Sequence, residues 1–486
     1  MSRLPAIFDR TLSAEARAVA WPAHLETVFA HLAREAHCVW LDSAGGSAGL
    51  ARWSVLAAAP SAVLVHEAGS SRLLDASGRP VGGDLPAGAF DALRAVLAAT
   101  TVEGGPAGLP FGPGFYGCLA YDLAPEVESK ATLSPQRDIP LPEMWLGFYE
   151  TVLVVDRAER RAMLVGGPPW AGREAIEAAL ASAAGASVAE KPAAASRPAD
   201  LTCNFTRDAY LQAVQRAREY IAAGDIYQVN LSRRFTATLG GGDAPAGLAD
   251  LYLRLRRANP APYAAYVGLG EGRAVLSSSP ELFLELGPGG RVLTRPIKGT
   301  RPRRPGDAAF NRRMRRDLLA SPKDRAELVM IVDLERNDLG RVCSYGSIRV
   351  AEPRAVEAYA AVYHTVATVE GRLHPDRSLT DLLRATFPGG SITGAPKVRA
   401  MQVIAELEPT RRSVYTGAVG FLGPRSAAEP AGRCVLNLAI RTLLADWPRV
   451  HLQVGGGIVA DSDPAAEFDE TTDKARAMLA ALGLAT

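Results

Sequence analysis

Residues 294–300 read Thr-Arg-Pro-Ile-Lys-Gly-Thr, and Lys298 is the side chain around which the chemistry of the chain is organised. The residues before it, 291–294, are typical of a short strand, because apolar side chains lead toward a proline that cannot donate to a strand ladder. Gly299 allows a tight turn, which predicts Lys298 at a strand end rather than on a mobile loop. A surface lysine in a turn explains these seven residues equally well. The stretches that follow decide between the two interpretations.

The composition is that of an ordinary soluble globular protein, with 486 residues, 48% of them hydrophobic and 22% charged. A net charge of +2 is too small to argue for nucleic acid or a membrane surface as a partner, and neither is expected. Seven arginines within residues 301–317 predict a solvated helix face. Five scattered cysteines without metal-binding spacing suit a reducing cytosol. No stretch is long and apolar enough to span a bilayer, and the N-terminus has no signal-type apolar core, so we expect a cytoplasmic protein.

The chain is expected to divide into three parts. Residues 1–165 mix short apolar runs with Gly and Pro, which is typical of a sheet-rich layer with few helices. Residues 166–202 are rich in Ala and Pro and predict a helix that runs out into a flexible linker. Residues 203–486 contain the chemically distinctive stretches. They open with a helix that Thr206 can cap and Gly224 can end.

Two stretches of the second half are candidates for the wall of a cleft. Residues 225–232 alternate as a strand, with Gln228, Asn230 and Ser232 on one face, which points either to solvent or into a cleft. Residues 387–397 form a Gly-rich loop that feeds a helix. A phosphate-binding loop needs Lys-Ser/Thr directly after its last glycine, and here Ala-Pro intervenes. The loop therefore predicts a row of backbone N–H groups for any anion, carboxylates included.

Acidic side chains recur at helical spacing. Glu327 lies on a partly apolar face of a helix that Ser321 can cap, where a carboxylate is costly unless it pairs with an arginine or holds a metal. Glu467, Glu470 and Lys474 share one stripe of the final helix, which is ordinarily a solvated face. Two glutamates about 4 Å apart repel by about 4 kcal/mol at an effective dielectric of about 20. Such a pair needs a cation, and oxygen ligands select Mg²⁺ or a similar hard ion.

Together, these side chains indicate one kind of substrate. Lys298, Arg441 and Lys474 supply positive charge, and Gly-rich backbone recurs at residues 387–397 and 455–457. A small, carboxylate-rich acid bridged by a metal ion satisfies all of these features.

The same stretches closely resemble the chorismate-utilising enzymes, and seven blocks in the right order make the resemblance specific. These blocks are GDIYQVNLSRRF (224–235), SSSPELF (277–283), TRPIKGTRPR (294–303), DRAELVMIVDLERNDLGR (324–341), FPGGSITGAPKVRA (387–400), AIRT (439–442) and GGGIVADSDPAAEFDETTDKA (455–475). The resemblance runs from about residue 203 to the C-terminus, and residues 114–123 and 138–150 resemble the family's N-terminal region. It implies an α+β (α/β) fold in which two antiparallel β-sheets pack face to face, flanked by helices, with both halves of the chain contributing.

Within this family, residues 298 and 228 distinguish branches. The anthranilate-, isochorismate- and salicylate-forming branches typically carry alanine at the first position, and the last two carry lysine at the second. Lys298 with Gln228 resembles the branch that forms 4-amino-4-deoxychorismate for p-aminobenzoate and folate, from chorismate and ammonia. The ammonia is expected from a separate glutamine amidotransferase subunit. Anthranilate synthase component I is the alternative.

The resemblance also implies roles for individual residues. Glu327 and Glu470 would hold Mg²⁺, and Glu281 would be the general acid and base. His364 would lie near the leaving hydroxyl. Lys298 would add at C2 of chorismate and expel the C4 hydroxyl, after which ammonia would enter at C4 and expel the lysine. Substrate-binding roles fall on Thr393, Tyr415, Arg441, Gly455, Lys474 and Gln228.

A second small molecule is suggested by the first half of the chain. Ser43, in Leu-Asp-Ser, and the run Pro262, Tyr263, Ala264 resemble segments that hold L-tryptophan in relatives. An ordinary core position explains them nearly as well. Asn437 stands where many relatives have aspartate, and it receives no role. Two rival functions remain open at this point, a nucleotide-binding protein and a non-catalytic tryptophan-binding regulator.

Overall fold

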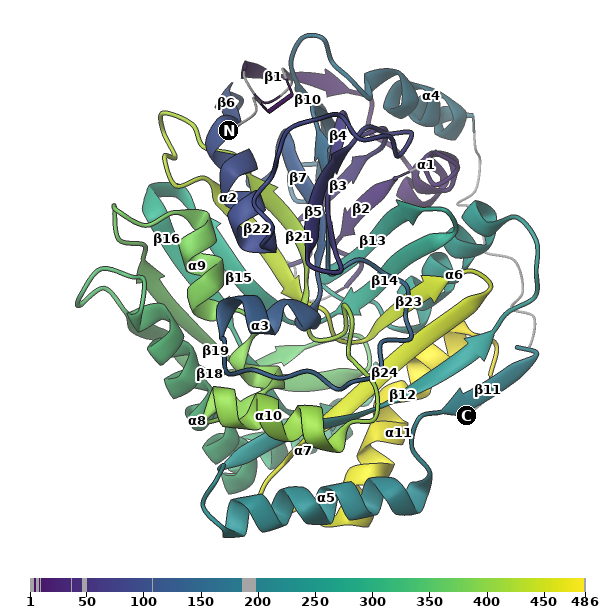
Figure 1. Cartoon of the computed structure of the whole chain (residues 1–486). Helices are drawn as coiled ribbons and strands as arrows, with labels where there is room; N and C mark the ends of the chain where they lie inside the picture. The colour runs from purple at the N-terminus through teal and green to yellow at the C-terminus, as the bar shows by residue number, and fades with distance from the viewer. Residues whose placement is uncertain are drawn as a thin grey trace.

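The computed structural model describes residues 4–484, except 6, 7, 9, 36, 46–49, 107 and 186–197. Within these residues, two large β-sheets are flanked by helices (Figure 1). The first sheet runs, in spatial order, β11 (Asp200–Cys203), β12 (Gln228–Thr238), β24 (Arg449–Ile458), β23 (Thr442–Asp446), β14 (Arg273–Ser279), β13 (Tyr263–Gly270), β2 (Val39–Asp42), β3 (Trp53–Ala57), β9 (Thr151–Asp156), β10 (Arg161–Gly166), β1 (Thr11–Val19) and β6 (Thr101–Gly104), with β20 (Gly394–Ala395) paired to β12.

The second sheet is built in the same mixed way from both halves of the chain. It runs β17 (Ile297–Pro302), β19 (Val362–Arg372), β16 (Arg291–Arg295), β15 (Leu282–Gly287), β22 (Arg433–Leu438), β21 (Ala418–Gly423), β7 (Gly114–Leu119), β8 (Met144–Tyr149), β4 (Ala62–Glu67) and β5 (Ser70–Leu74), with β18 (Arg349–Ala358) paired to β19. Pairing between the named strands is antiparallel except between β1 and β6, which are parallel. The expectation of antiparallel sheets is therefore wrong for that one pair and confirmed for the others.

The two sheets face each other across one apolar core. Val154 and Val275 of the first sheet pack in the same buried cluster as Trp145 and Phe421 of the second. This burial explains why the strands of residues 1–166 read as short, continuous apolar runs. Because the core is shared, strands from both halves of the chain converge on the same interior.

Helices cover the outer faces of both sheets. Buried residues of α1 (Leu25–Leu32), α4 (Arg173–Ala184), α6 (Ala244–Ala258) and α11 (Pro464–Ala481) pack on the first sheet, and those of α2 (Ala89–Ala99), α8 (Pro322–Gly340) and α9 (Leu379–Thr386) pack on the second. A further cluster joins α5 (Arg207–Ala222) and α10 (Lys397–Leu407) to β12. The remaining helical segments are α3 (Ala124–Val127), α7 (Ala308–Ala320), η1 (Tyr121–Leu123), η2 (Pro288–Gly290) and η3 (Gly390–Ile392).

The predicted helix boundaries are confirmed where they can be checked. Thr206 caps α5 by accepting from the N–H of Ala209, and Gly224 follows that helix with a φ of 81°. Ser321 caps α8 in the same way. The helix expected within residues 166–202 is α4, and the linker predicted after it falls in residues 186–197, outside the described part of the chain.

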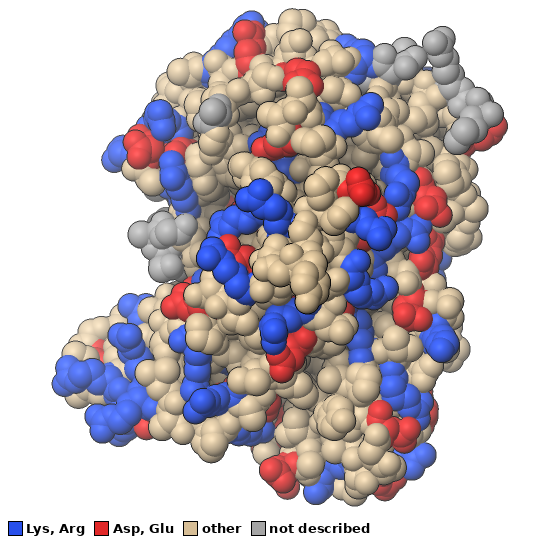
Figure 2. Space-filling view, turned by 90° about the vertical axis from the view of Figure 1, so that its left-hand side faces the viewer, with Lys and Arg blue, Asp and Glu red and all other residues tan. Residues whose placement is uncertain are grey.

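The arginine-rich stretch forms α7, a helix with a largely solvated surface. Leu318 is its one buried side chain among the described residues, and Arg312, Arg313, Arg315 and Arg316 are exposed, as predicted. Figure 2 shows Lys and Arg gathered on a projection at the lower left of one face and mixed with Asp and Glu elsewhere. None of the helices in the described part of the chain combines the length and the apolar character needed to cross a bilayer.

Candidate active site

Lys298 is the second residue of β17, at the edge of the second sheet. It pairs with Thr365 of β19, and the register then shifts at Gly299, which has a φ of 78°. A Cβ at Gly299 would lie 2.9 Å from the Asp324 carboxyl carbon, so the turn also requires a residue without a side chain. A bulge of this kind re-aims the neighbouring side chain. The predicted position of Lys298 at a strand end is confirmed.

The glycines of β24 bring Lys298 next to Gln228. A Cβ built on Gly457 would lie 2.3 Å from Gln228 Nε2 and 3.5 Å from Lys298 Nζ. Gln228 is buried, and neither its Nε2 nor its Oε1 has a hydrogen-bond partner among the described residues. Buried amides are normally hydrogen-bonded, so these atoms are available to a ligand. The polar face of β12 is therefore buried in the interior rather than exposed to solvent.

We expect Gly457→Ala to reduce turnover at least about a hundredfold, because a methyl group there displaces Gln228 and crowds Lys298, and a misplacement of about 1 Å can have an effect of that size. Steady-state kinetics with chorismate, alongside a thermal melt, measures both activity and folding. Gly240→Ala is the matched control, since a Cβ there meets nothing within 4 Å. Wild-type turnover in the Gly457 variant would show that the close approach is unimportant.

Glu281 follows β14 and is buried in the same interior. Ser391 Oγ donates a hydrogen bond to Glu281 Oε1 at 2.7 Å. Burial raises the pKa of Glu281 to about 7, against the opposing influence of Ser391, Lys298 and the Ile297 N–H. A carboxyl group that is half protonated near neutral pH is suited both to donate and to accept a proton.

His364 of β19 is a neutral hydrogen-bonding group. Its Nδ1 lies 3.0 Å from Thr300 Oγ1 and 3.3 Å from the carbonyl oxygen of Gly299. Burial, reinforced by the positive charge of Arg441, lowers the pKa of His364 to about 3. Since the Gly299 carbonyl only accepts, we assign the proton to Nδ1, which leaves Nε2 as an acceptor. Nε2 is buried and has no partner among the described residues.

Arg441 lies near Glu281 and His364, just after β22. Its φ of 50° is left-handed, a strained conformation for a non-glycine residue that is often found at functional sites. The guanidinium donates to Asn259 Oδ1 at 3.3 Å, and its charge acts on both Glu281 and His364. This is its one side-chain hydrogen bond among the described residues, so further donors of the guanidinium are available to a carboxylate.

Glu327 and Glu470 approach the site from two helices, α8 and α11. Burial raises the pKa of Glu327, and Glu470 raises it further, whereas Lys298 and Lys323 lower it. Lys474 Nζ lies 2.7 Å from Glu470 Oε1 and donates to the Gly455 carbonyl oxygen at 2.8 Å. The Coulombic attraction of Lys474 is the main cause that lowers the pKa of Glu470. The residues predicted to bind the metal, the predicted nucleophile and the residues predicted to bind carboxylates therefore lie around one interior.

The residues present fit a hard divalent cation only in part. Among the described residues, no group of three or more His, Cys, Asp or Glu side chains is arranged to hold a metal by itself. Mg²⁺, however, is commonly bound by one or two carboxylates together with oxygens of the substrate. Glu327 and Glu470 suit that arrangement. Glu467, to which sequence analysis gave no role, lies beside them, with its Oε2 3.0 Å from a Cβ placed on Gly456.

Thr393 belongs to the Gly-rich loop, which a buried ion pair attaches to β12. Arg412 pairs with Glu408 at 2.7 Å and donates to the carbonyl oxygens of Ile392 and Asn230 at 3.0 and 2.8 Å. The N–H of Asn230 donates to the Thr393 carbonyl at 2.8 Å. Sequence analysis missed this ion pair, because Arg and Glu four residues apart ordinarily indicate an exposed helix.

Tyr415 is buried beside Arg412, whose guanidinium lies 5.8 Å from the centre of its ring. Burial raises the pKa of this phenol, so it stays neutral and can donate to a carboxylate. Lys397, at the helix end of the Gly-rich loop, donates to Asp338 and to the carbonyl oxygens of Thr386 and Pro388. It is engaged within the protein and supports the loop rather than a phosphate group.

The four residues predicted to hold tryptophan do come together. Ser43 Oγ donates to the Pro262 carbonyl oxygen at 3.2 Å, and Tyr263 and Ala264 continue into β13 beside β2. Asn437 Nδ2 donates to the Tyr263 carbonyl at 2.7 Å, which links β22 of the second sheet to β13 of the first. Asn437 thus has a structural role, and tryptophan binding stays a prediction.

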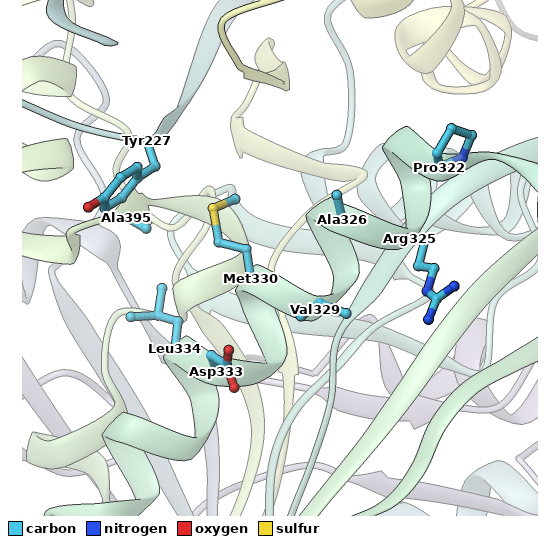
Figure 3. Close-up of a pocket in the computed structure, with 9 residues that line it drawn as sticks. All are labelled: Tyr227, Pro322, Arg325, Ala326, Val329, Met330, Asp333, Leu334 and Ala395. Atoms are coloured by element: carbon cyan, nitrogen blue, oxygen red, sulfur yellow. The ribbon is translucent and has the colours of Figure 1, made fainter. Parts of the chain in front are cut away.

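A groove of about 720 Å³ lies on the outer side of this site, between α8 and the start of β12 (Figure 3). Its lining includes Tyr227 and Ala326, the chain neighbours of Gln228 and Glu327. Figure 3 shows Tyr227, Met330 and Leu334 along one stretch of it. None of the predicted site residues lines the groove, so it is distinct from the interior where Lys298 and Glu281 meet.

Comparison with known proteins identifies the family. A sequence profile described as chorismate binding enzyme matches residues 37–480. The chain therefore belongs to the chorismate binding enzyme family.

Relatives with two different names are about equally similar. Anthranilate synthase component 1 of Streptomyces coelicolor is 43% identical over 421 residues, which cover 83% of this chain and 78% of the relative. Aminodeoxychorismate synthase component 1 of Klebsiella aerogenes is 44% identical over 372 residues, 76% of this chain and 77% of the relative. The crystal structure of anthranilate synthase component I from Streptococcus pneumoniae matches with a TM-score of 0.72 and 32% identity, over 88% of this chain and 92% of that one. The fold and the family are thus established, whereas overall identity does not distinguish the two reactions.

Proposed function

We propose that this protein converts chorismate and ammonia to 4-amino-4-deoxychorismate, the reaction of aminodeoxychorismate synthase component 1 in the pathway to p-aminobenzoate and folate. The observation that carries the proposal is the position of Lys298, whose Nζ, like Gln228 Nε2, lies close to the bare backbone of Gly457 and in the field of Glu281. A lysine is able to form a carbon–nitrogen bond, which the alanine typical of the anthranilate branch cannot.

The proposed reaction proceeds in two substitutions that balance. Lys298 Nζ forms a bond to C2, the two conjugated ring double bonds move from C1=C2 and C5=C6 to C1=C6 and C4=C5, and the C4–O bond breaks as Glu281 protonates the leaving hydroxyl, which departs as water. Ammonia then forms a bond to C4, both double bonds move back, and the C2–N bond to Lys298 breaks. His364 Nε2 accepts a hydrogen bond at the C4 oxygen, and Arg441 and Lys474 bind the carboxylates. Glu327 and Glu470 would hold Mg²⁺, which would supply positive charge at the ring carboxylate.

The ammonia is proposed to come from a separate glutamine amidotransferase subunit. Glutaminases of the cysteine type need an accessible thiolate. All five cysteines of this chain are free, and burial raises the pKa of Cys118 to about 12 and that of Cys343 to about 11. Cys38 and Cys434 are buried as well, with raised pKa values, so the argument applies to four of the five thiols, and the fifth, Cys203, is half-buried at the end of the edge strand β11. Free thiols also fit a cytoplasmic location.

Identification of the product tests this proposal. Purified protein given chorismate, Mg²⁺ and ammonium should form 4-amino-4-deoxychorismate without pyruvate, as read by chromatography with mass detection. Glutamine in place of ammonium should give no product until an amidotransferase subunit is added. Anthranilate with an equal amount of pyruvate would establish the alternative, anthranilate synthase component I, which the 43% identity to the Streptomyces coelicolor protein also supports. Turnover of glutamine by the chain alone would contradict the separate subunit.

A further inference from the structure

The turn at the tip of the Gly-rich loop lies between two buried carboxyl groups. On one side Ser391 Oγ donates to Glu281 Oε1 at 2.7 Å, and Ser391 is only 7% exposed. On the other side the N–H of Gly390 donates to Glu335 Oε1 at 3.3 Å, and Thr294 Oγ1 lies 3.4 Å from the second oxygen. Neither Ser391 nor Glu335 was singled out by the sequence.

The surroundings hold this turn firmly. Lys397 donates to the carbonyl oxygen of Pro388 below the turn, and Arg412 donates to that of Ile392 above it. A Cβ at Gly390 would meet the side chain of Leu334 at 2.7 Å, so the loop is packed directly on α8. Ser391 therefore presents its hydroxyl to Glu281 from a fixed backbone.

We propose that Ser391 is a positioning residue that determines which oxygen of Glu281 carries the transferred proton. The inference rests on the proposed role of Glu281 as the proton donor to the leaving hydroxyl. A hydroxyl that donates to Oε1 makes that oxygen the acceptor, so the carboxyl proton resides on Oε2. Removal of the hydroxyl removes the donor to Oε1 and leaves the backbone N–H of Ile297 as the donor to this carboxyl group, so the position of the proton and the orientation of the group are less restricted.

The charged groups that face Glu281 do not supply this selection. Lys298 and Arg441 stabilise its ionised form as a whole, and Glu335 faces it from below the turn. Such charges act on the protonation state of the carboxyl group, whereas a single short hydrogen bond distinguishes one oxygen from the other. Ser391 is the side chain that makes such a bond to Glu281 within the described part of the chain.

Ser391→Ala tests the proposal. We expect kcat to fall by about 10- to 100-fold with KM for chorismate changed by less than about threefold, because the proton donor is misplaced but not lost, and a misplacement of about 1 Å costs up to about 100-fold. The alkaline limb of the kcat profile should move to higher pH, because the hydrogen bond from Ser391 lowers the pKa of Glu281 and the group acts while protonated. Ser391→Thr, which keeps the hydroxyl, should restore both kcat and the profile.

Ser61→Ala is the matched control, because Ser61 Oγ donates to Glu150 Oε1 at 2.5 Å far from the site, and it should leave the kinetics unchanged. The substrate is chorismate with ammonium, and consumption of chorismate is followed so that the result does not depend on which product forms. If Glu281→Gln is inactive and Ser391→Ala is unaffected, the positioning role of Ser391 is overturned and the proposed role of Glu281 stands. If Ser391→Ala lowers kcat but does not move the alkaline limb, and Ser391→Thr does not restore kcat, Ser391 has only a structural role. An active Glu281→Gln variant would overturn both the inference and the proposed role of Glu281.

Discussion

Replacement of Lys298 by alanine, methionine or arginine is expected to lower formation of the aminated product at least about a thousandfold, as loss of a covalent nucleophile generally does. An ordinary lysine, with a pKa of about 10.4, is neutral in only about one molecule in 2,500 at pH 7. Burial lowers the pKa of Lys298, and the nearby Lys474 lowers it further, against the opposing charges of Glu327, Glu281 and Glu470. The fraction able to attack carbon is thereby increased.

The three substitutions separate the possible roles of this residue. Arginine keeps the positive charge but is not deprotonated in proteins, so Lys298→Arg preserves electrostatic contact and removes the nucleophile. Methionine has a side chain of similar length to lysine but carries neither the positive charge nor the nucleophilic amine. Lys130→Ala, at an exposed lysine, controls for a general effect of charge removal. Substantial turnover in Lys298→Arg, measured as product formed per minute, would limit Lys298 to an electrostatic role.

Glu327→Ala and Glu470→Ala are each expected to reduce turnover at least about a hundredfold and to raise the Mg²⁺ concentration needed for activity, because each removes a ligand from a site with few of its own. The fold should remain, since Glu470 is exposed on α11 and Glu327 is only partly buried on α8. Titration of activity with Mg²⁺, and calorimetry of Mg²⁺ binding with and without chorismate, measures the effect. Binding should be much tighter when the substrate is present.

Asp333→Ala is the control for this pair. Asp333 lies on the same helix as Glu327 but is exposed and paired with Arg336 at 2.9 Å, so its loss should leave the Mg²⁺ dependence unchanged. Full activity of wild-type protein in an excess of chelator would contradict the metal assignment.

Local signals in the sequence predicted those parts of the site whose side chains lie on regular elements. The stripe of α11 predicted that Glu470 and Lys474 would lie together, and the alternation of β12 placed Gln228 and Asn230 on one face. Burial of the polar face could not be derived, because a solvated face and a buried polar face have the same sequence pattern. The three glycines of residues 455–457 indicated a close approach of backbone, and the structure shows that Gln228 and Lys298 are what they approach.

Contacts between residues far apart in the chain could not be predicted from local sequence patterns. The hydrogen bond between Ser391 and Glu281 spans 110 positions, and Asn437 reaches Tyr263 across 174. Neither contact produces a repeating pattern in the sequence, since a single polar residue in a loop or strand is equally consistent with exposure to solvent. The intertwined sheets, too, followed from resemblance rather than from pattern, because alternation predicts strands but not their partners.

The covalent intermediate offers the most direct test of the central claim, that Lys298 is a nucleophile and the chain an aminating enzyme. Protein incubated with chorismate and Mg²⁺ in the absence of ammonia is analysed by intact-protein mass spectrometry and then by peptide mapping. We predict an adduct on Lys298 whose mass is that of protein plus chorismate less one water, and which disappears when ammonium is added. The absence of any adduct, or an adduct on Lys474 or Lys397 instead, would contradict the account.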